Sequence, residues 1–228
     1  MGLLKYVLWL FFPKRCAVCG KIIERKKDLC ENCDNTIERI EKSCSVCGAP
    51  RKHCECRRIV YRFKGCVAPF YWGDNSKKMI YRFKLHGKLD AADFFAENIY
   101  KKVKECFCDQ KFDIVTAVPM SPFKKIGKGY NHSEVIAKAL ARKMGVEFKK
   151  LLNKKPFCKS QHTMKRDERF ENVKGMFYPK AEAHYKKVLL VDDIKTTGAT
   201  LNECTKELLF AGVEEVFCSV CVLGIEKQ

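Results

Sequence analysis

The pattern of apolar and polar residues predicts alternating strands and helices over the second half of the chain. Largely apolar runs at residues 112–119, 188–191 and 215–224 are typical of strands that are buried on both faces of a parallel sheet. Between them, apolar residues at helical spacing predict amphipathic helices at residues 132–144 and 201–211. This alternation favours an α/β fold, in which helices cover both faces of a mostly parallel sheet.

Upstream of this region, the pattern is less regular. Residues 91–106 predict one more helix, with an apolar stripe formed by Phe94, Phe95, Ile99 and Val103. Residues 59–73 alternate as strands do, and residues 79–88 follow them. Cationic and aromatic residues interleave across both segments: Arg62, Phe63, Tyr71, Trp72, Lys77, Lys78, Tyr81, Arg82, Phe83, Lys84 and Lys88. Such a mixture suits single-stranded nucleic acid, but we favour a half-buried hairpin and helix with polar outer faces over a dedicated platform.

The stretch at residues 188–201, VLLVDDIKTTGATL, carries the strongest chemical signal. Asp192 and Asp193 follow the apolar run, and a loop then leads into a helix; this loop contains Thr196, Thr197, Gly198, Ala199 and Thr200. Glycine lets successive backbone N–H groups turn toward one anion, and the helix N-terminus adds partial positive charge. The two carboxylates lie where a ribose diol, or a diol bridged by Mg2+, would bind. A generic polar turn is the alternative, but the full order of residues favours a sugar-phosphate site.

Residues 16–56 hold four close cysteine pairs, which predict a metal-binding segment. Each pair presents two sulfurs, and two pairs complete a closed four-thiolate site. The segment has too little apolar sequence for a core, so metal must supply its folding energy. We expect two structural zinc ions, although interleaved pairing stays open and an iron–sulfur cluster is the second choice. The expected ligand sets are Cys16, Cys19, Cys30 and Cys33, and then Cys44, Cys47, Cys54 and Cys56.

The net charge of the chain adds a preference for anionic partners to this interpretation. The chain has 228 residues and a formal net charge of +18, which two thiolate-bound zinc ions would leave strongly basic. Such a surface favours polyanions: nucleic acid, phosphorylated small molecules or an anionic membrane face. A general enrichment in surface lysine is the alternative explanation. The remaining cysteines are expected to be small buried apolar residues; they are Cys66, Cys106, Cys108, Cys158, Cys204, Cys218 and Cys221.

The N-terminal residues 1–13 form an apolar stretch that is too short to span a bilayer and lacks a small-residue cleavage site. We predict a short apolar helix packed on the body of the protein, with a membrane-surface helix as the alternative. No transmembrane segment is therefore expected, and the protein is expected to be cytoplasmic. In a reducing cytoplasm, paired cysteines indicate metal more often than disulfides.

The stretch at residues 188–200 resembles the phosphoribosyl-diphosphate (PRPP) motif of the type I phosphoribosyltransferases. With its cysteine-rich N-terminal segment, the whole chain resembles the ComF family. This resemblance implies a double zinc ribbon at residues 1–57 and a phosphoribosyltransferase-like domain at residues 58–228. It also implies a pyrophosphate loop at Lys128 and Gly129, where the family usually has an arginine in place of the lysine. The basic segment at residues 120–131 is expected to form the loop that contains both residues. Residues 151–177 are a long polar, cationic segment typical of a mobile lid, and Arg166 and Arg169 within it match the flexible loop of the family.

By the same resemblance, Asp192 and Asp193 would be the catalytic pair that holds the ribose hydroxyls, and Mg2+ would bind together with PRPP. The residues from Thr196 to Thr200 would hold the 5-phosphate, and the cations of the other two loops would hold pyrophosphate. The resemblance implies a protein of DNA uptake in natural transformation, which binds PRPP or ribose 5-phosphate and single-stranded DNA beside a DNA-translocating helicase. The alternative is an active phosphoribosyltransferase of nucleotide salvage, whose acceptor the sequence does not name. A purely structural role is the third hypothesis.

Overall fold

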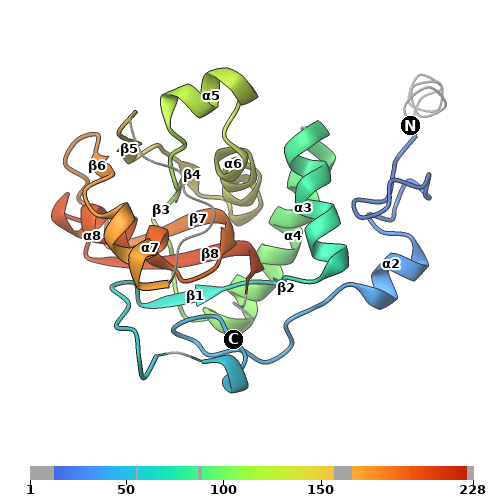
Figure 1. The fold of residues 1–228 in the computed structure, drawn as a ribbon, viewed down its shortest axis with the longest axis horizontal. Helices are drawn as coiled ribbons and strands as arrows, with labels where there is room; N and C mark the ends of the chain where they lie inside the picture. Colours follow the sequence, from blue (N-terminus) through green and yellow to red (C-terminus); the bar gives the residue numbers. More distant parts are fainter. Residues whose placement is uncertain (1–12, 55, 87–88, 157–165, 225–228) are drawn as a thin grey trace.

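The computed structural model describes residues 13–54, 56–86, 89–156 and 166–224, and a parallel sheet lies at its centre (Figure 1). The strand order is β1-β8-β7-β3-β4, β2 also pairs with β8, and the strands pair in parallel. The predicted α/β class with a mostly parallel sheet is confirmed. The strands are β1 (Gly65–Val67), β2 (Phe70–Tyr71), β3 (Ile114–Ala117), β4 (Glu147–Phe148), β7 (Lys187–Lys195) and β8 (Glu215–Leu223).

Helices cover both faces of the sheet, and the alternation of side chains along β7 decides what each face receives (Figure 1). Leu189 and Val191 pack in one core cluster with residues of α3, α4 and α6. Val188 and Leu190 pack in a second cluster with residues of α8. The helices of the described residues are α2 (Glu31–Thr36), α3 (Asp74–His86), α4 (Leu89–Cys106), α5 (Pro122–Lys128), α6 (His132–Met144), α7 (Arg166–Val173) and α8 (Ala199–Phe210), with a 3-10 turn η1 (Arg51–His53).

Strand β7 is longer than the apolar run that predicted it. We expected the strand to end at Val191, but its pairing with β8 continues through Asp192 to Lys195. The residues of β8 opposite this extension are apolar and buried, so the ladder continues although the side chains of β7 become charged. The acidic pair therefore lies on the strand itself, near the carboxyl edge of the sheet, and only the threonine–glycine segment forms the loop.

Helix α6 begins and ends as its sequence predicts. The side chain of Asn131 accepts a hydrogen bond from the backbone N–H of Ser133, and Gly145 ends the helix in a left-handed conformation. Glu134 stands three residues after Asn131, the position from which an acidic side chain could complete a capping box. Its carboxylate instead forms an ion pair with Lys150 at 2.8 Å, which ties the first turn of α6 to the segment after β4.

Two segments that read as loops contain regular structure. Helix α5 occupies most of the basic loop expected at residues 120–131. The cationic lid expected at residues 151–177 begins and ends in a two-stranded antiparallel sheet of β5 (Leu152–Lys154) and β6 (Phe177–Pro179), and it includes α7. Residues 157–165 of this lid lie outside the described part of the chain.

The expected hairpin in residues 59–73 is wrong. Strands β1 and β2 both pair in parallel with β8, and the residues before β1 form no strand. Phe63 and Phe83 are buried in the two core clusters, so these rings are not available to stack on a nucleic acid. For these two rings, the interpretation of a half-buried segment holds, rather than that of a nucleic-acid platform. Trp72 and Tyr81 remain 39% and 52% exposed, which leaves two aromatic side chains on this surface.

The cysteine-rich segment is fastened along the β1–β2 edge of the sheet. The backbone N–H of Tyr71 donates to the carbonyl of Glu38 at 2.8 Å, and that of Cys66 donates to Ser45 at 3.3 Å. Ile40 donates in turn to the carbonyl of Pro69 at 2.9 Å. Covering an edge in this way satisfies backbone groups that would otherwise be open to pairing with another chain.

The same segment contributes to both core clusters. Cys16 and Cys33 pack with the cluster that contains Phe83, whereas Cys47 packs with the cluster that contains Cys66. Residues 1–12, where we predicted a short apolar helix, lie outside the described residues. Within the described residues, no helix is long and apolar enough to cross a membrane.

Gly48 provides a test of this docking. It has a φ of +78°, and a Cβ atom there would stand 2.9 Å from the carbonyl oxygen of Cys66 in β1. Gly145 has a similar φ of +69° but has no atom within 4 Å of such a Cβ. Gly145→Ala is therefore expected to cost about 1 kcal/mol of unfolding free energy from backbone strain alone. Gly48→Ala is expected to cost at least twice that, because it also pushes the cysteine-rich segment away from β1.

Chemical denaturation of the two variants, followed by circular dichroism, measures the difference. Equal losses of stability in Gly48→Ala and Gly145→Ala would contradict the close seating of this segment on the sheet.

Candidate functional site

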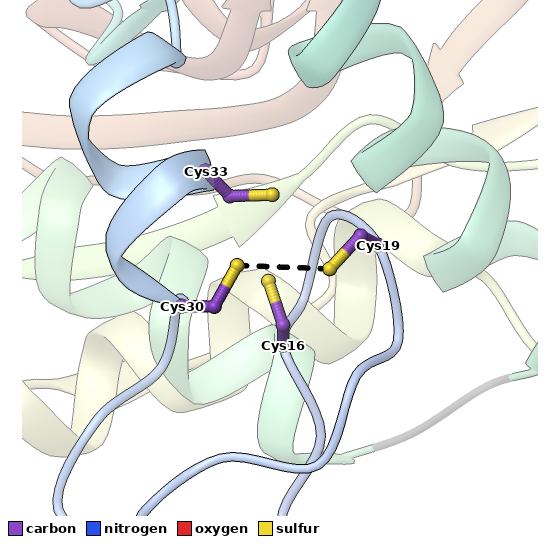
Figure 2. Close-up of side chains that lie close together, drawn as sticks. All are labelled: Cys16, Cys19, Cys30 and Cys33. Carbon is purple, nitrogen blue, oxygen red and sulfur yellow. Dashed lines mark hydrogen bonds between the residues drawn. The ribbon is translucent and has the colours of Figure 1, made fainter.

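The first group of four cysteines converges on one point, as Figure 2 shows. Cys16 and Cys19 come from a tight turn that ends at Gly20, which has a φ of +78°. Cys30 and Cys33 come from the start of α2. The Cys19 and Cys30 sulfurs are 3.7 Å apart, and all four sulfurs lie within 4.8 Å of one another. A tetrahedral zinc ion with Zn–S bonds of 2.3 Å requires sulfur–sulfur distances of about 3.8 Å, so the donor set fits zinc.

The second group repeats this geometry beside β1. The Cys44 and Cys56 sulfurs are 3.7 Å apart, and those of Cys47 and Cys54 are 3.8 Å apart. The structure thus brings the eight cysteines together in the two sets that the sequence favoured, without interleaving. His53 is exposed and is not a member of the group.

Backbone hydrogen bonds prepare one thiol in each group for metal binding. Burial disfavours the thiolate of Cys16, but hydrogen bonds from the backbone of Cys19, Cys30 and Val18 outweigh burial and lower its pKa to about 7. Cys44 has the same balance, and its pKa is also lowered to about 7. Because the thiolate is the form that binds metal, each site holds one ligand that is readily deprotonated near neutral pH.

The other cysteines behave largely as predicted. Four of the seven are buried in the cores: Cys66, Cys204, Cys218 and Cys221. Cys106 is half-buried and Cys108 is exposed, whereas Cys158 lies outside the described residues.

The acidic pair is held by two different partners. The carboxylate of Asp192 is buried, and it accepts hydrogen bonds from the hydroxyl of Ser133 at 2.8 Å and from the backbone N–H of Asp193 at 2.9 Å. The carboxylate of Asp193 is half-buried and forms an ion pair with Lys84 of α3 at 2.6 Å. The start of α6 and the end of α3 thus meet the tip of β7 at the same edge of the sheet.

Burial raises the pKa of Asp192 to about 7, and the charge of Asp193 adds to the rise. The hydrogen bond from Ser133 opposes the rise only in part. A carboxylate that is costly to ionise in the free protein gains when a Mg2+ ion or a hydroxyl pair arrives. This environment suits a ligand site better than a structural one.

The loop after β7 has the form that an anion site requires. Gly198 has a φ of +84° and stands at the N-terminus of α8. The hydroxyl of Thr197 accepts a hydrogen bond from the backbone N–H of Ala199 at 3.3 Å, so part of its polar capacity is used within the loop. Thr196 is exposed and Thr200 is half-buried, which leaves both side chains near solvent.

The second predicted loop reaches the same edge of the sheet through α5. Lys128 is the last residue of α5, and Gly129 follows it with a φ of +78°. Tyr130 donates its hydroxyl hydrogen bond to the carbonyl of Phe83 at 3.3 Å, and the side-chain amide of Asn131 donates to the carbonyl of Val118 at 2.9 Å. These contacts anchor the loop to α3 and to the residue after β3. The side chain of Lys128 lies outside the description.

For Arg166 and Arg169, the structure describes the position of the backbone only. Both lie on α7, which packs against α8, the helix that follows the loop at residues 196–198 (Figure 1). Their side chains lie outside the description, so their contact with a ligand stays a prediction.

A cavity of about 310 Å³ adjoins the loop that contains α5. Asn131 and Glu134 of the α6 start line it on one side, and Phe148, Lys150 and Tyr178 line it on others. Asn131 accepts a hydrogen bond from the backbone of Ser133, whose hydroxyl meets Asp192, so this cavity and the acidic pair share one supporting network.

Three residues at this edge escaped prediction from the sequence, and a fourth, Lys84, was named only among the cations of a possible nucleic-acid surface. Ser133 and Lys84 contact the acidic pair, whereas Tyr61 and Lys195 lie against the loop at residues 196–198. Ser133 lies two residues after the N-cap Asn131, in the first turn of α6, and a polar residue there was a signal for the contact of Ser133 with the acidic pair. The contacts of Lys84 and Tyr61, and that of Lys195 with Tyr61, join segments that are far apart in the sequence, so no local sequence pattern predicts them.

Comparison with known proteins finds two domain families in this chain. A double zinc ribbon domain matches residues 7–60, and a phosphoribosyl transferase domain matches residues 131–228. Competence protein F of Haemophilus influenzae is 27% identical, covering 90% of this chain and 95% of that protein. Competence protein ComFC of Streptococcus pneumoniae is 28% identical, covering 89% and 96%. DNA utilization protein YhgH of Escherichia coli K12 is 21% identical, covering 82% and 87%.

A solved purine phosphoribosyltransferase from Pyrococcus horikoshii overlaps with a TM-score of 0.36 at 16% identity, covering 58% of this chain and 72% of that one, a level that supports no conclusion by itself. The two domain matches and the near full-length relatives carry the assignment. With its two tetracysteine groups joined to a parallel sheet that bears the acidic pair, the chain belongs to the ComF family, as a double zinc ribbon followed by a phosphoribosyltransferase domain.

Proposed function

We propose that this protein binds PRPP, or its ribose 5-phosphate part, at the carboxyl edge of the sheet, and that it handles single-stranded DNA during uptake for natural transformation. The observation that carries the first part is the buried carboxylate of Asp192, with its raised pKa, beside a left-handed glycine at a helix N-terminus. A diol or metal binds at the first feature, and a phosphate binds at the second.

Within this site the protein residues have separate tasks. Asp192 and Asp193 accept hydrogen bonds from the ribose hydroxyls, while the loop from Thr196 to Thr200 holds the 5-phosphate. Ser133 and Lys84 keep the two carboxylates apart and oriented. Mg2+, when bound with PRPP, would neutralise the diphosphate, and the two carboxylates fit its preference for oxygen ligands. Lys128, Arg166 and Arg169 would face the diphosphate.

Two structural zinc ions complete the protein in this proposal. The sulfur distances in both cysteine groups fit tetrahedral zinc, and the eight thiols favour a reducing cytoplasmic location. Because Cys47 packs in a core cluster of the sheet, the metal stabilises more than its own segment.

The DNA part of the proposal rests on charge and exposure. The chain carries a formal net charge of +18, and Lys77, Lys78 and Tyr81 lie exposed on α3 near the exposed Trp72. Cations contact phosphates and rings stack on bases in nonspecific single-strand binding. The relatives are named for competence and DNA utilization, and the family resemblance adds a DNA-translocating helicase as the partner.

An active phosphoribosyltransferase is the second candidate function. The cavity of about 310 Å³ favours it, because this space, which shares the support of Asn131 with the acidic pair, could receive an acceptor molecule. Turnover of labelled PRPP with a panel of bases and amines distinguishes the two functions.

Zinc content tests the metal sites. We expect two zinc ions per chain by elemental analysis, and one in Cys47→Ser, which also melts at a lower temperature because Cys47 contacts the sheet core. Cys108→Ser alters an exposed thiol outside both groups and should keep two ions. Two ions retained in Cys47→Ser, or iron in place of zinc, would count against this assignment.

Removing the charge of Asp192 is predicted to weaken ligand binding but to stabilise the protein without ligand. Asp192→Asn should weaken binding of Mg2+ and PRPP at least about 10-fold, measured by calorimetry, because it removes a charged oxygen ligand. Asp109→Asn removes the same charge from an exposed position, so it should bind Mg2+ and PRPP as the wild type does.

The stability effect follows from the raised pKa of Asp192. Between its ordinary pKa of 3.8 and about 7, the folded protein keeps a proton that the unfolded chain has released. This contribution to stability is fully present below about pH 4 and is lost as pH rises through 7. Without ligand, Asp192→Asn should therefore melt several degrees above the wild type at pH 8, and the gap should shrink at pH 5. A variant that melts lower at pH 8 would contradict the buried, ligand-directed carboxylate.

Salt-dependent binding tests the DNA surface. The double variant Lys77→Gln, Lys78→Gln should bind a fluorescent single strand several-fold more weakly and should reduce the salt slope by about one unit. The variant Lys101→Gln, Lys104→Gln removes the same charge from exposed positions of α4. If both double variants lose affinity equally, the interaction is only general attraction to a basic protein.

A further inference from the structure

Lys195 is a buried lysine at the base of the phosphate-binding loop. It is the last residue of β7, it is only 4% exposed, and the loop begins with the next residue. Its Cε atom would stand 3.0 Å from a Cβ atom placed on Gly198, so the end of the side chain lies against the turn of the loop. Lysine is rarely buried without a partner, because removing an ammonium group from water is costly.

No carboxylate in the described part of the chain forms an ion pair with Lys195. Its ammonium group instead lies 5.2 Å from the centre of the Tyr61 ring. Around it are the buried thiols of Cys66 and Cys218; burial raises the pKa of Cys66 to about 12, and the charge of Lys195 opposes that rise. A cation over a ring recovers only part of the hydration that the ammonium group has lost. The site therefore holds positive charge that an anion would balance.

Tyr61 holds this arrangement together from another part of the sequence. It lies in the connector between the second cysteine group and β1, and its ring stacks on the buried Phe63 at 4.7 Å between centroids. Its hydroxyl donates a hydrogen bond to the carbonyl of Thr197 at 3.2 Å. One residue further, the backbone N–H of Arg62 donates to the side chain of Asn202 in α8 at 2.6 Å. The connector is thus fastened to the loop and to the helix that follows it.

Three independent features meet here: a left-handed glycine at a helix N-terminus, a buried lysine without a carboxylate partner, and a tyrosine that bridges both. We propose that Lys195 is the counter-charge for the phosphate monoester of the bound sugar, and that Tyr61 positions both Lys195 and the loop for it. The proposal rests on the sugar-phosphate function above and adds two residues to that site. It also makes the connector of the zinc ribbon a part of the ligand site.

Calorimetry on the full-length, zinc-loaded protein with three separate probes tests this assignment: ribose 5-phosphate, PRPP with Mg2+, and pyrophosphate with Mg2+. Lys195→Met keeps the length of the side chain and removes its charge, so it should weaken binding of ribose 5-phosphate and PRPP about 10-fold or more. Binding of pyrophosphate, which lacks the monoester group, should stay within about twofold. Tyr61→Leu should weaken the same two probes, and Tyr61→Phe should have a smaller effect because it keeps the ring.

Lys187→Met is the matched control, since Lys187 lies at the opposite end of the same strand and pairs with Glu215. It carries the same change in net charge and should bind all three probes as the wild type does. Melting curves without ligand separate a binding role from a structural one. Lys195→Met should melt at or above the wild-type temperature, because it removes a buried charge.

The outcomes are distinguishable. A wild type that binds neither ribose 5-phosphate nor PRPP overturns the proposed function and this inference with it. A wild type that binds both probes, with unchanged affinity in Lys195→Met, overturns this inference alone. Loss of folding in Lys195→Met also overturns it, since Lys195 would then be a structural residue.

Discussion

The ladder between β7 and β8 is the constraint on which the rest of this structure depends. Its register runs from Lys187 opposite Glu215 to Lys195 opposite Leu223, and it continues where the side chains of β7 change from apolar to charged. Since each residue of a strand has a fixed face and height, this register alone places two carboxylates and an ammonium group at the edge of the sheet. Neighbouring elements then supply one partner for each of them. The candidate site is thus built mainly on strand backbone, and only the threonine–glycine segment after β7 is a loop.

Much of this arrangement can be read from local patterns. Buried strands, the caps of α6 and the acidic pair followed by a glycine loop each have a short signature, because each depends on residues close in sequence. The length of β7 could not be read this way, since its charged end is kept in the sheet by β8. The same reason hides Ser133 and Tyr61, whose roles depend on tertiary contacts. Helix α5 was missed because the glycine-bearing basic segment resembles a loop.

The cysteine-rich segment shows a similar limit. Spacing was enough to propose two four-thiolate sites, and the sulfur geometry agrees with that proposal. Spacing was not enough to show that Cys33 and Cys47 belong to core clusters on opposite faces of the sheet. An isolated zinc ribbon would need only its metal to fold. Here the ribbon also covers the edge that β1 and β2 would otherwise expose, so metal binding and sheet integrity are linked through shared packing rather than through a flexible tether.

The parallel pairing of β1 with β8 has a consequence for synthesis of the protein. Gly65 pairs with Phe217, so β1 has no partner strand in the sheet until the chain has been synthesised through β8. Contacts between such distant segments form slowly, because a long loop must close before they contribute. During this interval the cysteine-rich segment, which precedes β1, is already complete and able to take up its metal. Its backbone contact with β1, the hydrogen bond from Cys66 to Ser45, would then cover one edge of that strand before β8 is available to pair with it.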